Sequence, residues 1–238
     1  MTYTYLDCLA YLGVGGAHPG GLQLTKNILL AVEKIDDTTS VLDVGCGTGQ
    51  TSAYIAENYR CYVTSLDSNK IMLDKAKQRF SSLQIPIEVK QGNTENLPFD
   101  NASFDVILSE SVITFTDISK TIPEFIRVLK SSGVLLAIEM VLEKGISADE
   151  NKQIVDFYGF SQLLTESEWY ELFKRAGFRS ISVEKYNPEF SDINIQNAAD
   201  FSISENIDDT LLEILEKHEE LTEIYKDKLG FRIFRCYV

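Results

Sequence analysis

Basic residues are few in this sequence. Its 238 residues include 22 Lys and Arg against 36 Asp and Glu, which gives a formal net charge of −14. A surface of this charge repels phosphate groups unless its basic residues cluster, and no run of Lys and Arg occurs. We therefore expect neither a nucleic acid nor an anionic membrane surface as a partner.

Cysteines and long apolar runs are also few. Cys8, Cys46, Cys61 and Cys236 stand singly, without a CxxC pair, which predicts neither a disulfide framework nor a metal site. No stretch approaches the ~18 apolar residues that span a membrane, and the first residues lack the basic and apolar segments of a signal peptide. We expect a cytoplasmic protein.

What the sequence does contain is an alternation of short apolar runs with helix-compatible segments. The predicted strands are 40–44, 61–66, 87–91, 104–109, 134–140, 178–186 and 231–238, and the predicted helices are 26–35, 50–58, 69–81, 118–129, 166–176 and 207–228. This alternation predicts an α/β fold with a doubly wound, mostly parallel sheet of seven strands.

Local signals set some of the boundaries. Thr25 and Ser68 are the expected N-caps of the helices that follow them. Gly133 lies where a predicted helix gives way to a strand, which suits a turn residue with positive φ. Between residues 143 and 166 the pattern is too loose to predict an element.

No repeat, low-complexity tract or Pro/Gly/Ser linker divides the chain, so we expect one domain from residue 1 to 238. Within it, residues 40–186 form the predicted core sheet and 229–238 the last strand. A helical N-terminal cap (1–39) and a helical insertion before the last strand (187–228) are predicted to cover the site.

The motif that carries most chemical information is a glycine loop. Gly45, Gly47 and Gly49 follow the first predicted strand, and Asp43 lies two residues before them. Such a loop places a ligand at the crevice of a doubly wound sheet. The spacing GxGxG differs from the GxGxxG loop that binds a dinucleotide pyrophosphate, while Asp67 closes the next strand and can accept hydrogen bonds from a ribose diol. A neutral or cationic ribosyl ligand is therefore predicted.

Five motifs occur in order: VLDVGCGTGQ, TSLD, QGNTENLPF, FDVILSESVI and RVLKSSGVLL. They resemble the successive motifs of class I S-adenosylmethionine-dependent methyltransferases, most of all the small-molecule type of ubiquinone and menaquinone biosynthesis. The resemblance is close over residues 41–140 and weak over 163–186. It implies a Rossmann-like methyltransferase fold, S-adenosyl-L-methionine as cofactor and methyl transfer to a small molecule.

The resemblance also implies how the first motifs hold the cofactor. The loop 43–49, including Cys46, would hold the methionine part. Asp67 would bind the ribose hydroxyls with Ser68 alongside, and Met72 would pack on the adenine.

The later motifs imply further contacts. Relatives usually carry an acid where this chain has Asn93, next to Thr94, and the side-chain carbonyl of Asn93 can still accept a bond from the adenine amino group. Glu110 and Ser111 would line the methionine end and face the substrate. An alternative for Glu110 is a carboxylate that merely ends a strand in solvent.

Catalysis needs a base only if the acceptor must lose a proton, because the sulfonium already activates the methyl group. His18, in an HPGG segment similar to one in some small-molecule methyltransferases, and Glu110 are the candidate catalytic residues for an oxygen or nitrogen acceptor. His18 has the alternative role of shaping its turn, and a carbon or sulfur acceptor also fits.

Two other functions remain open from the sequence. One is an NAD(P)-dependent oxidoreductase, which the glycine spacing disfavours. The other is a non-catalytic cofactor-binding regulatory protein, because no base is certain. We expect a monomer or a homodimer.

Overall fold

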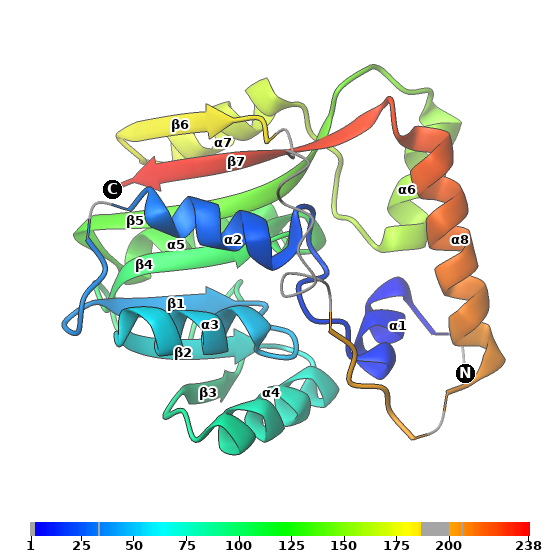
Figure 1. Cartoon of the computed structure of the whole chain (residues 1–238). Coiled ribbons are helices and arrows are strands. Elements are labelled where there is room, and N and C mark those ends of the chain that lie inside the picture. Colours follow the sequence, from blue (N-terminus) through cyan, green and yellow to red (C-terminus); the bar gives the residue numbers. More distant parts are fainter. Residues whose placement is uncertain (1–2, 33, 187–199, 206) are drawn as a thin grey trace.

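The computed structural model describes residues 3–32, 34–186, 200–205 and 207–238. Its centre is a seven-stranded sheet in the order β3-β2-β1-β4-β5-β7-β6 (Figure 1). The strands are β1 (Ser40–Val44), β2 (Tyr62–Asp67), β3 (Glu88–Gln91), β4 (Phe104–Glu110), β5 (Leu129–Leu142), β6 (Ser180–Glu184) and β7 (Leu229–Tyr237). Strands β1 to β5 pair in parallel, whereas β7 runs antiparallel to both β5 and β6. The predicted α/β class with a mostly parallel sheet is confirmed.

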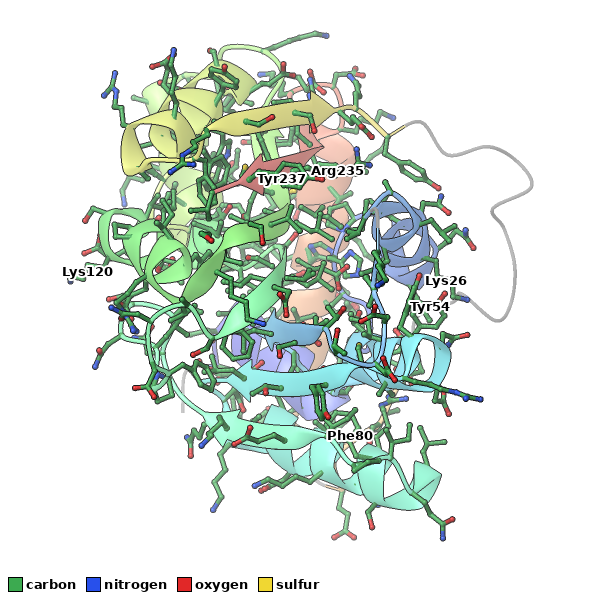
Figure 2. All side chains as sticks on the ribbon, turned by 90° about the vertical axis from the view of Figure 1, so that its left-hand side faces the viewer. Lys26, Tyr54, Phe80, Lys120, Arg235 and Tyr237 are labelled. Carbon is green, nitrogen blue, oxygen red and sulfur yellow. The ribbon has the colours of Figure 1, made fainter. Side chains whose placement is uncertain are left out.

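Helices cover both faces of the sheet. One face carries α2 (Gly21–Leu30), α3 (Gln50–Tyr59) and α4 (Lys70–Leu83), and the other carries α5 (Ile118–Val128) and α7 (Glu166–Ala176) (Figure 1). Figure 2 shows Lys26 of α2 and Tyr54 of α3 on the opposite side of the sheet from Lys120 of α5. The ammonium of Lys26 lies 5.0 Å from the ring centre of Tyr54 and so links α2 to α3.

An apolar core lies on each face of the sheet. Because successive side chains of a strand point to opposite faces, Val41 of β1 packs against the α2 and α3 side and Leu42 against the α5 and α7 side. The first core includes Leu24, Ile28, Ile55, Leu108 and Leu136, and the second includes Ile107, Phe125, Leu135, Trp169 and Phe173. Burial on both faces explains why the central strands are continuous apolar runs in the sequence.

A third group of helices lies beyond the carboxyl ends of the parallel strands (Figure 1). It consists of α1 (Tyr5–Leu12), α6 (Ala148–Tyr158) and α8 (Asp209–Tyr225). The thiol of Cys8 donates to the carbonyl of Leu211 at 3.3 Å, which joins α1 to α8. The helical N-terminal cap and the helix before the last strand are therefore confirmed, while residues 187–199 of the predicted insertion lie outside the described residues. None of the described helices is long and apolar enough to cross a membrane.

Three local predictions are wrong. Helix α2 begins at Gly21 instead of Lys26, so Thr25 is no N-cap but a buried residue inside the helix. Asn69, not Ser68, caps α4, because its side chain accepts from the backbone N–H groups of the first turn. Gly133 lies inside β5 without positive φ; a Cβ there would come within 3.0 Å of the Lys130 carbonyl, so the glycine permits a close approach of the backbone.

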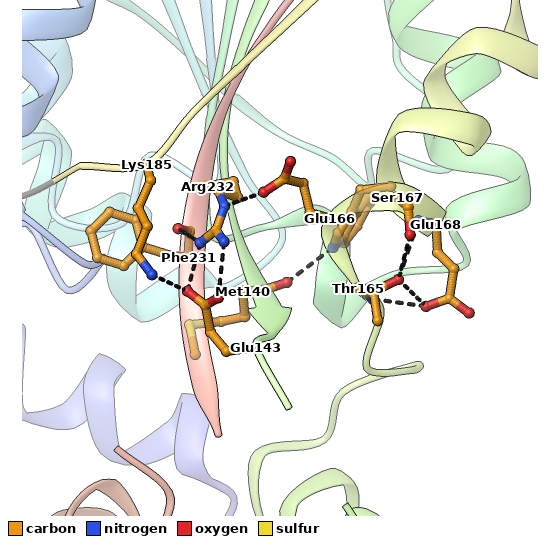
Figure 3. Close-up of polar contacts among 10 residues, drawn as sticks. Met140, Glu143, Thr165, Glu166, Ser167, Glu168, Lys185, Phe231 and Arg232 are labelled. Atoms are coloured by element: carbon orange, nitrogen blue, oxygen red, sulfur yellow. Dashed lines mark hydrogen bonds and ion pairs between the residues drawn. The ribbon is translucent and has the colours of Figure 1, made fainter. Parts of the chain in front are cut away.

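A cluster of ion pairs holds the ends of β5 and β7 together beside α7 (Figure 3). The guanidinium of Arg232 forms a bidentate pair with Glu143, at 2.8 and 2.9 Å, and its Nε donates to Glu166 at 2.5 Å. Lys185 also donates to Glu143, at 2.8 Å. These hydrogen bonds lower the pKa of Glu143 to about 2. They fix the start of β7, which forms part of the cavity wall described next.

Candidate active site

A cavity of about 700 Å³ lies at the carboxyl ends of β1, β2 and β4. This is the edge at which doubly wound sheets bind their ligands. Its floor is the loop after β1 and the ends of β2 and β4, and its roof is formed by α1, α8 and the segment after α6. The volume is within the range of small-molecule sites.

The glycine loop turns by means of three left-handed residues, Gly45, Gly47 and Gly49, with φ of 64°, 54° and 76°. A Cβ on Gly45 would lie 2.5 Å from the side chain of Val112, and one on Gly49 would lie 2.5 Å from the ring of Phe80. A Cβ on Gly47 would meet only the sulfur of Met72, at 4.0 Å. Gly47 therefore faces the cavity, whereas Gly49 does not line it and instead lets α3 pack on α4.

Asp43 is buried beneath this loop, at the end of β1. It accepts a hydrogen bond of 2.5 Å from Ser52, which in turn accepts one of 2.6 Å from Ser65. Burial, followed by the charge of Glu110, raises the pKa of Asp43 to about 8. A positively charged ligand in the cavity would reverse this effect, because it favours the ionised carboxylate.

Asp67 ends β2 and lines the cavity next to Ser68. Its two carboxylate oxygens accept from the backbone N–H groups of Gly47, at 2.9 Å, and Asn69, at 2.8 Å. Each oxygen keeps a further lone pair for a ligand, as a carboxylate has about four acceptor sites. Burial raises the pKa of Asp67, so this group also gains from a hydrogen-bond donor in the cavity.

Most of the remaining residues assigned to the cofactor line the same cavity. Cys46, Met72, Asn93 and Thr94 all line it. The side-chain oxygen of Asn93 already accepts from the backbone N–H of Glu95, at 2.9 Å. It therefore has one lone pair left for an adenine amino group.

Glu110 and His18, the two candidate bases, meet in a hydrogen-bonded cluster. Glu110 accepts from the hydroxyls of Thr25, at 2.5 Å, and Thr51, at 2.9 Å, and lies 3.3 Å from His18 Nε2. The other ring nitrogen of His18 lies 3.2 Å from the carbonyl of Pro19. The alternative of a solvent-facing Glu110 is wrong, because its side chain is only 8% exposed and is held by three partners.

Two buried polar atoms of the cavity wall have no hydrogen-bond partner in the part of the chain that the structure describes. They are Oε1 of Gln50, at the start of α3, and Oγ of Ser111, just after β4. Ser111 also has a left-handed φ of 57°, a strained conformation typical of functional sites. An unpartnered buried acceptor costs about 1–3 kcal/mol, which a donor on a bound ligand would recover. These atoms fit the ammonium end of S-adenosylmethionine.

Glu139 of β5 holds the segment that follows β4. Its oxygens accept from the N–H groups of Val112, Ile113 and Thr114, at 3.2, 3.0 and 3.2 Å, and from the Thr114 hydroxyl at 2.6 Å. Burial nevertheless raises the pKa of Glu139 to about 7. Sequence reasoning missed this residue, although a lone acid in the apolar run VLLAIEMVL was a signal for it.

Sequence reasoning also missed other residues at the site. These are Gln50, Thr25 and Thr51 near the glycine loop, and His218 at the other end of the cavity. Gln50 and Thr51 follow the glycine loop directly, so their position was a signal. The others are brought to the cavity by helices that come from distant parts of the chain.

The comparisons with known proteins agree with this geometry. The chain matches the methyltransferase domain family over residues 42–137. It is 40% identical over 234 residues to the uncharacterized methyltransferase YodH of Bacillus subtilis, and the match covers 98% of each chain. It is also 29% identical to the demethylmenaquinone methyltransferase of Staphylococcus epidermidis, over 66% of this chain and 75% of that protein.

One solved structure with the same fold is phosphoethanolamine N-methyltransferase 2 of Haemonchus contortus, in complex with S-adenosyl-L-methionine. The TM-score is 0.79 at 21% identity, over all of this chain and 58% of that one. With the near full-length match to a bacterial methyltransferase and the motifs gathered at one cavity, the conclusion is that the chain belongs to the class I S-adenosylmethionine-dependent methyltransferases.

Proposed function

We propose that the protein transfers a methyl group from S-adenosylmethionine to a small-molecule acceptor, with both molecules in the 700 Å³ cavity. The observation that carries this proposal is the pair of unpartnered buried oxygens, on Gln50 and Ser111, in the cavity that Gly47 also lines. Three acids, Asp43, Asp67 and Glu110, surround that space and favour a cationic ligand.

The cofactor would lie along the glycine loop. Gln50 and Ser111 would bind its amino-acid end, and Asp67 would accept from the ribose hydroxyls. The side-chain oxygen of Asn93 would accept a hydrogen bond from the adenine, and Met72 would pack against its ring as an apolar surface. The bound cofactor supplies the activated methyl group, and the chain's own part is to align the acceptor and to exclude water.

The acceptor would enter the half of the cavity that α1, α8 and the segment after α6 enclose. Relatives of this chain act on small molecules, as the names demethylmenaquinone methyltransferase and phosphoethanolamine N-methyltransferase state. The enclosed shape favours an acceptor of this size over a nucleic acid. The N-terminal cap (1–39) and the insertion (187–228) would select it.

A first test addresses the ribose contact. Asp67→Ala should weaken cofactor binding by about 2 kcal/mol, or about 30-fold in Kd, because a charge-assisted hydrogen bond is lost. Isothermal titration calorimetry with S-adenosylhomocysteine measures this. Asp74→Ala, an exposed carboxylate on α4 outside the cavity, is the matched control and should bind as the wild type does. Unchanged binding by Asp67→Ala would remove Asp67 from the ribose.

A second test addresses the reaction. The protein is incubated with a metabolite extract and a methyl-labelled donor, and mass spectrometry identifies the product that gains the label. Binding of NADH instead of S-adenosylhomocysteine would favour the oxidoreductase alternative. Tight cofactor binding without transfer to any acceptor would favour a regulatory role.

A further inference from the structure

The chain has two histidines, and they differ in what their ring nitrogens contact. Both ring nitrogens of His18 lie near oxygen atoms: Nδ1 is near the Pro19 carbonyl, and Nε2 is near Glu110 and the Thr25 hydroxyl. His218 of α8 is half-buried and lines the cavity, and its Nδ1 lies 3.0 Å from the hydroxyl of Tyr158. Among the described residues, the ring makes its hydrogen bond through Nδ1 and none through Nε2. His218 therefore has a ring nitrogen available to a ligand, and His18 does not.

The rings of Tyr5 and Tyr158 contact His218, and further aromatic side chains line the same part of the cavity. We call this part of the cavity the aromatic half; it is lined by Tyr5, Phe115, Tyr158, Phe160 and Tyr225. Tyr158 and Phe160 stack at 5.0 Å between ring centres, with 14° between their planes, and Phe115 packs edge-on to Phe160 at 5.0 Å. Tyr5 lies 5.1 Å from the ring of His218. Such walls favour a flat apolar molecule.

Charge is sparse in the aromatic half. Lys226 is the one Lys or Arg among the described lining residues, and it is ion-paired to Glu223 at the surface. The acids of the lining, Asp43, Asp67, Glu95 and Glu110, lie on or just after the strands and not on α1, α6 or α8. Neither a phosphate group nor an ammonium group would find a full counter-charge there.

Hydrogen bonding orients the His218 ring. The Tyr158 hydroxyl fixes Nδ1, and Tyr158 itself is held between Tyr5 and Phe160. Burial lowers the pKa of His218, so its imidazole is uncharged at neutral pH. In the tautomer whose Nδ1–H donates to the Tyr158 hydroxyl oxygen, Nε2 of the neutral imidazole carries no hydrogen and can accept a proton.

We propose that the aromatic half binds an uncharged, ring-bearing acceptor with a hydroxyl group, and that His218 takes the hydroxyl proton while Tyr158 positions the imidazole. This rests on the proposed function. The acceptor oxygen forms a bond to the methyl carbon as the bond from that carbon to sulfur breaks. The sulfonium charge is thereby lost, and the hydroxyl proton passes to Nε2 of His218, which becomes an imidazolium.

The test begins with binding, using the full chain. Calorimetry first measures S-adenosylhomocysteine and then titrates the complex with 2-naphthol as an uncharged ring-bearing probe, or with phosphoethanolamine as a charged one. We expect 2-naphthol to bind and His218→Gln to weaken it at least 5-fold, with the Kd of S-adenosylhomocysteine unchanged. Glu216→Gln, an exposed residue on the same helix, should leave both Kd values unchanged.

The labelled-donor experiment then decides the chemistry. The product should carry its new methyl group on the oxygen of an uncharged ring compound. With that acceptor, His218→Gln should lower kcat at least 100-fold, as removal of a general base does, while KM rises only about 5-fold, in line with the weaker binding of the probe. Tyr158→Phe should lower kcat by a smaller factor, about 10-fold, because the base remains and only its orientation is lost.

Several results would overturn the inference. They are binding of phosphoethanolamine but not of 2-naphthol, a labelled product that is an open-chain amine or a phosphate ester, and a His218→Gln variant with unchanged kcat. If no labelled product forms, failure of 2-naphthol to bind the S-adenosylhomocysteine complex is decisive against it. Loss of S-adenosylhomocysteine binding in the wild type would instead refute the proposed function, so the two failures are distinguishable.

Discussion

Gly47 combines a left-handed backbone with an unobstructed side toward the cavity. Its φ is 54°, and a Cβ would meet no protein atom closer than 4.0 Å. Gly47→Ala should therefore cost only about 1–2 kcal/mol in the free energy of unfolding, from backbone strain, yet weaken cofactor binding at least tenfold by occupying its space. Urea unfolding and calorimetry measure the two effects.

Gly159 provides a matched control for that substitution. It has a φ of 77°, ends α6 and would place a Cβ in open space. Gly159→Ala should show a similar loss of stability with cofactor affinity unchanged. Equal losses of affinity in the two variants would mean that strain, and not a clash with the cofactor, explains the Gly47 effect.

From the raised pKa of Asp43, we expect cofactor binding to release a proton. Its pKa of about 8 means that much of the free protein carries the protonated acid at pH 7, and a cationic ligand favours the carboxylate. Cofactor affinity should thus rise from pH 6 to pH 8. The binding enthalpy at pH 7 should differ between phosphate and Tris buffers, which have different ionisation enthalpies.

Asp43→Asn provides the control, because an amide does not titrate. The buffer dependence should be lost in this variant. A wild-type enthalpy that is the same in both buffers would show that Asp43 keeps its protonation state when the cofactor binds.

At the residue scale, the sequence predicts the contacts that follow from short segments. Asp43, Gly47 and Asp67 line the cavity because loops at adjacent strand ends must meet there. Thr25 and Thr51 could not be assigned, since their shared partner Glu110 lies 85 and 59 residues away. The free Nε2 of His218 depends likewise on the packing of α8.

Among the secondary-structure elements, β5 supports the segment after β4 through Glu139. The folded-state pKa of this residue is about 7 against 4.5 as its ordinary value, so the folded protein retains a proton that the unfolded chain releases between these pH values. Stability should accordingly fall as the pH rises from 4.5 through 7. Urea midpoints at pH 5, 6.5 and 8 measure this decline.

Glu139→Gln removes the group that titrates, so stability should fall less steeply with pH. The fall that comes from the raised pKa of Asp43 should remain, up to about pH 8. The variant should be about 1–3 kcal/mol less stable at pH 5, because the amide presents N–H groups to backbone N–H donors. Glu213→Gln, on the exposed side of α8, should follow the wild type at every pH. A parallel decline in Glu139→Gln would contradict the assignment.

A helix or strand could be predicted from the sequence when its buried apolar residues recur at the regular spacing of that element. The run SVLDV predicted β1 with its observed bounds, and the segment 166–176 predicted α7, because both bury apolar residues in a core. Helix α6 buries only Ile154 and Tyr158, so its pattern was too weak, although Ser147 and Glu150 form a capping box. Helix α2 begins five residues before the predicted helix. Glycine disfavours helix, so Gly20 and Gly21 gave no sign of a helix start, yet Gly20 is the N-cap and Gly21 the first helical residue.

At the scale of the whole molecule, the alternation of strands and helices was enough to predict the sheet and the edge at which ligand binds. It was not enough to predict the aromatic half of the cavity. Helices α1, α6 and α8 bury few residues against the sheet. They pack instead on one another, although they are far apart in the sequence. No local pattern encodes contacts of that kind.

The reversed direction of β7 determines which segment reaches this edge. For the parallel strands, the residues that follow each strand lie at the ligand-binding edge of the sheet. Because β7 runs antiparallel, the residues that precede it, which form α8, lie at this edge instead. In the proposed function, the methyl donor is bound by the turns after β1, β2 and β4. The acceptor is bound by other parts of the chain, among which α8 supplies His218 and Tyr225. Exchanging residues 207–228 between homologues should therefore change which acceptor is preferred, while the affinity for the methyl donor stays the same.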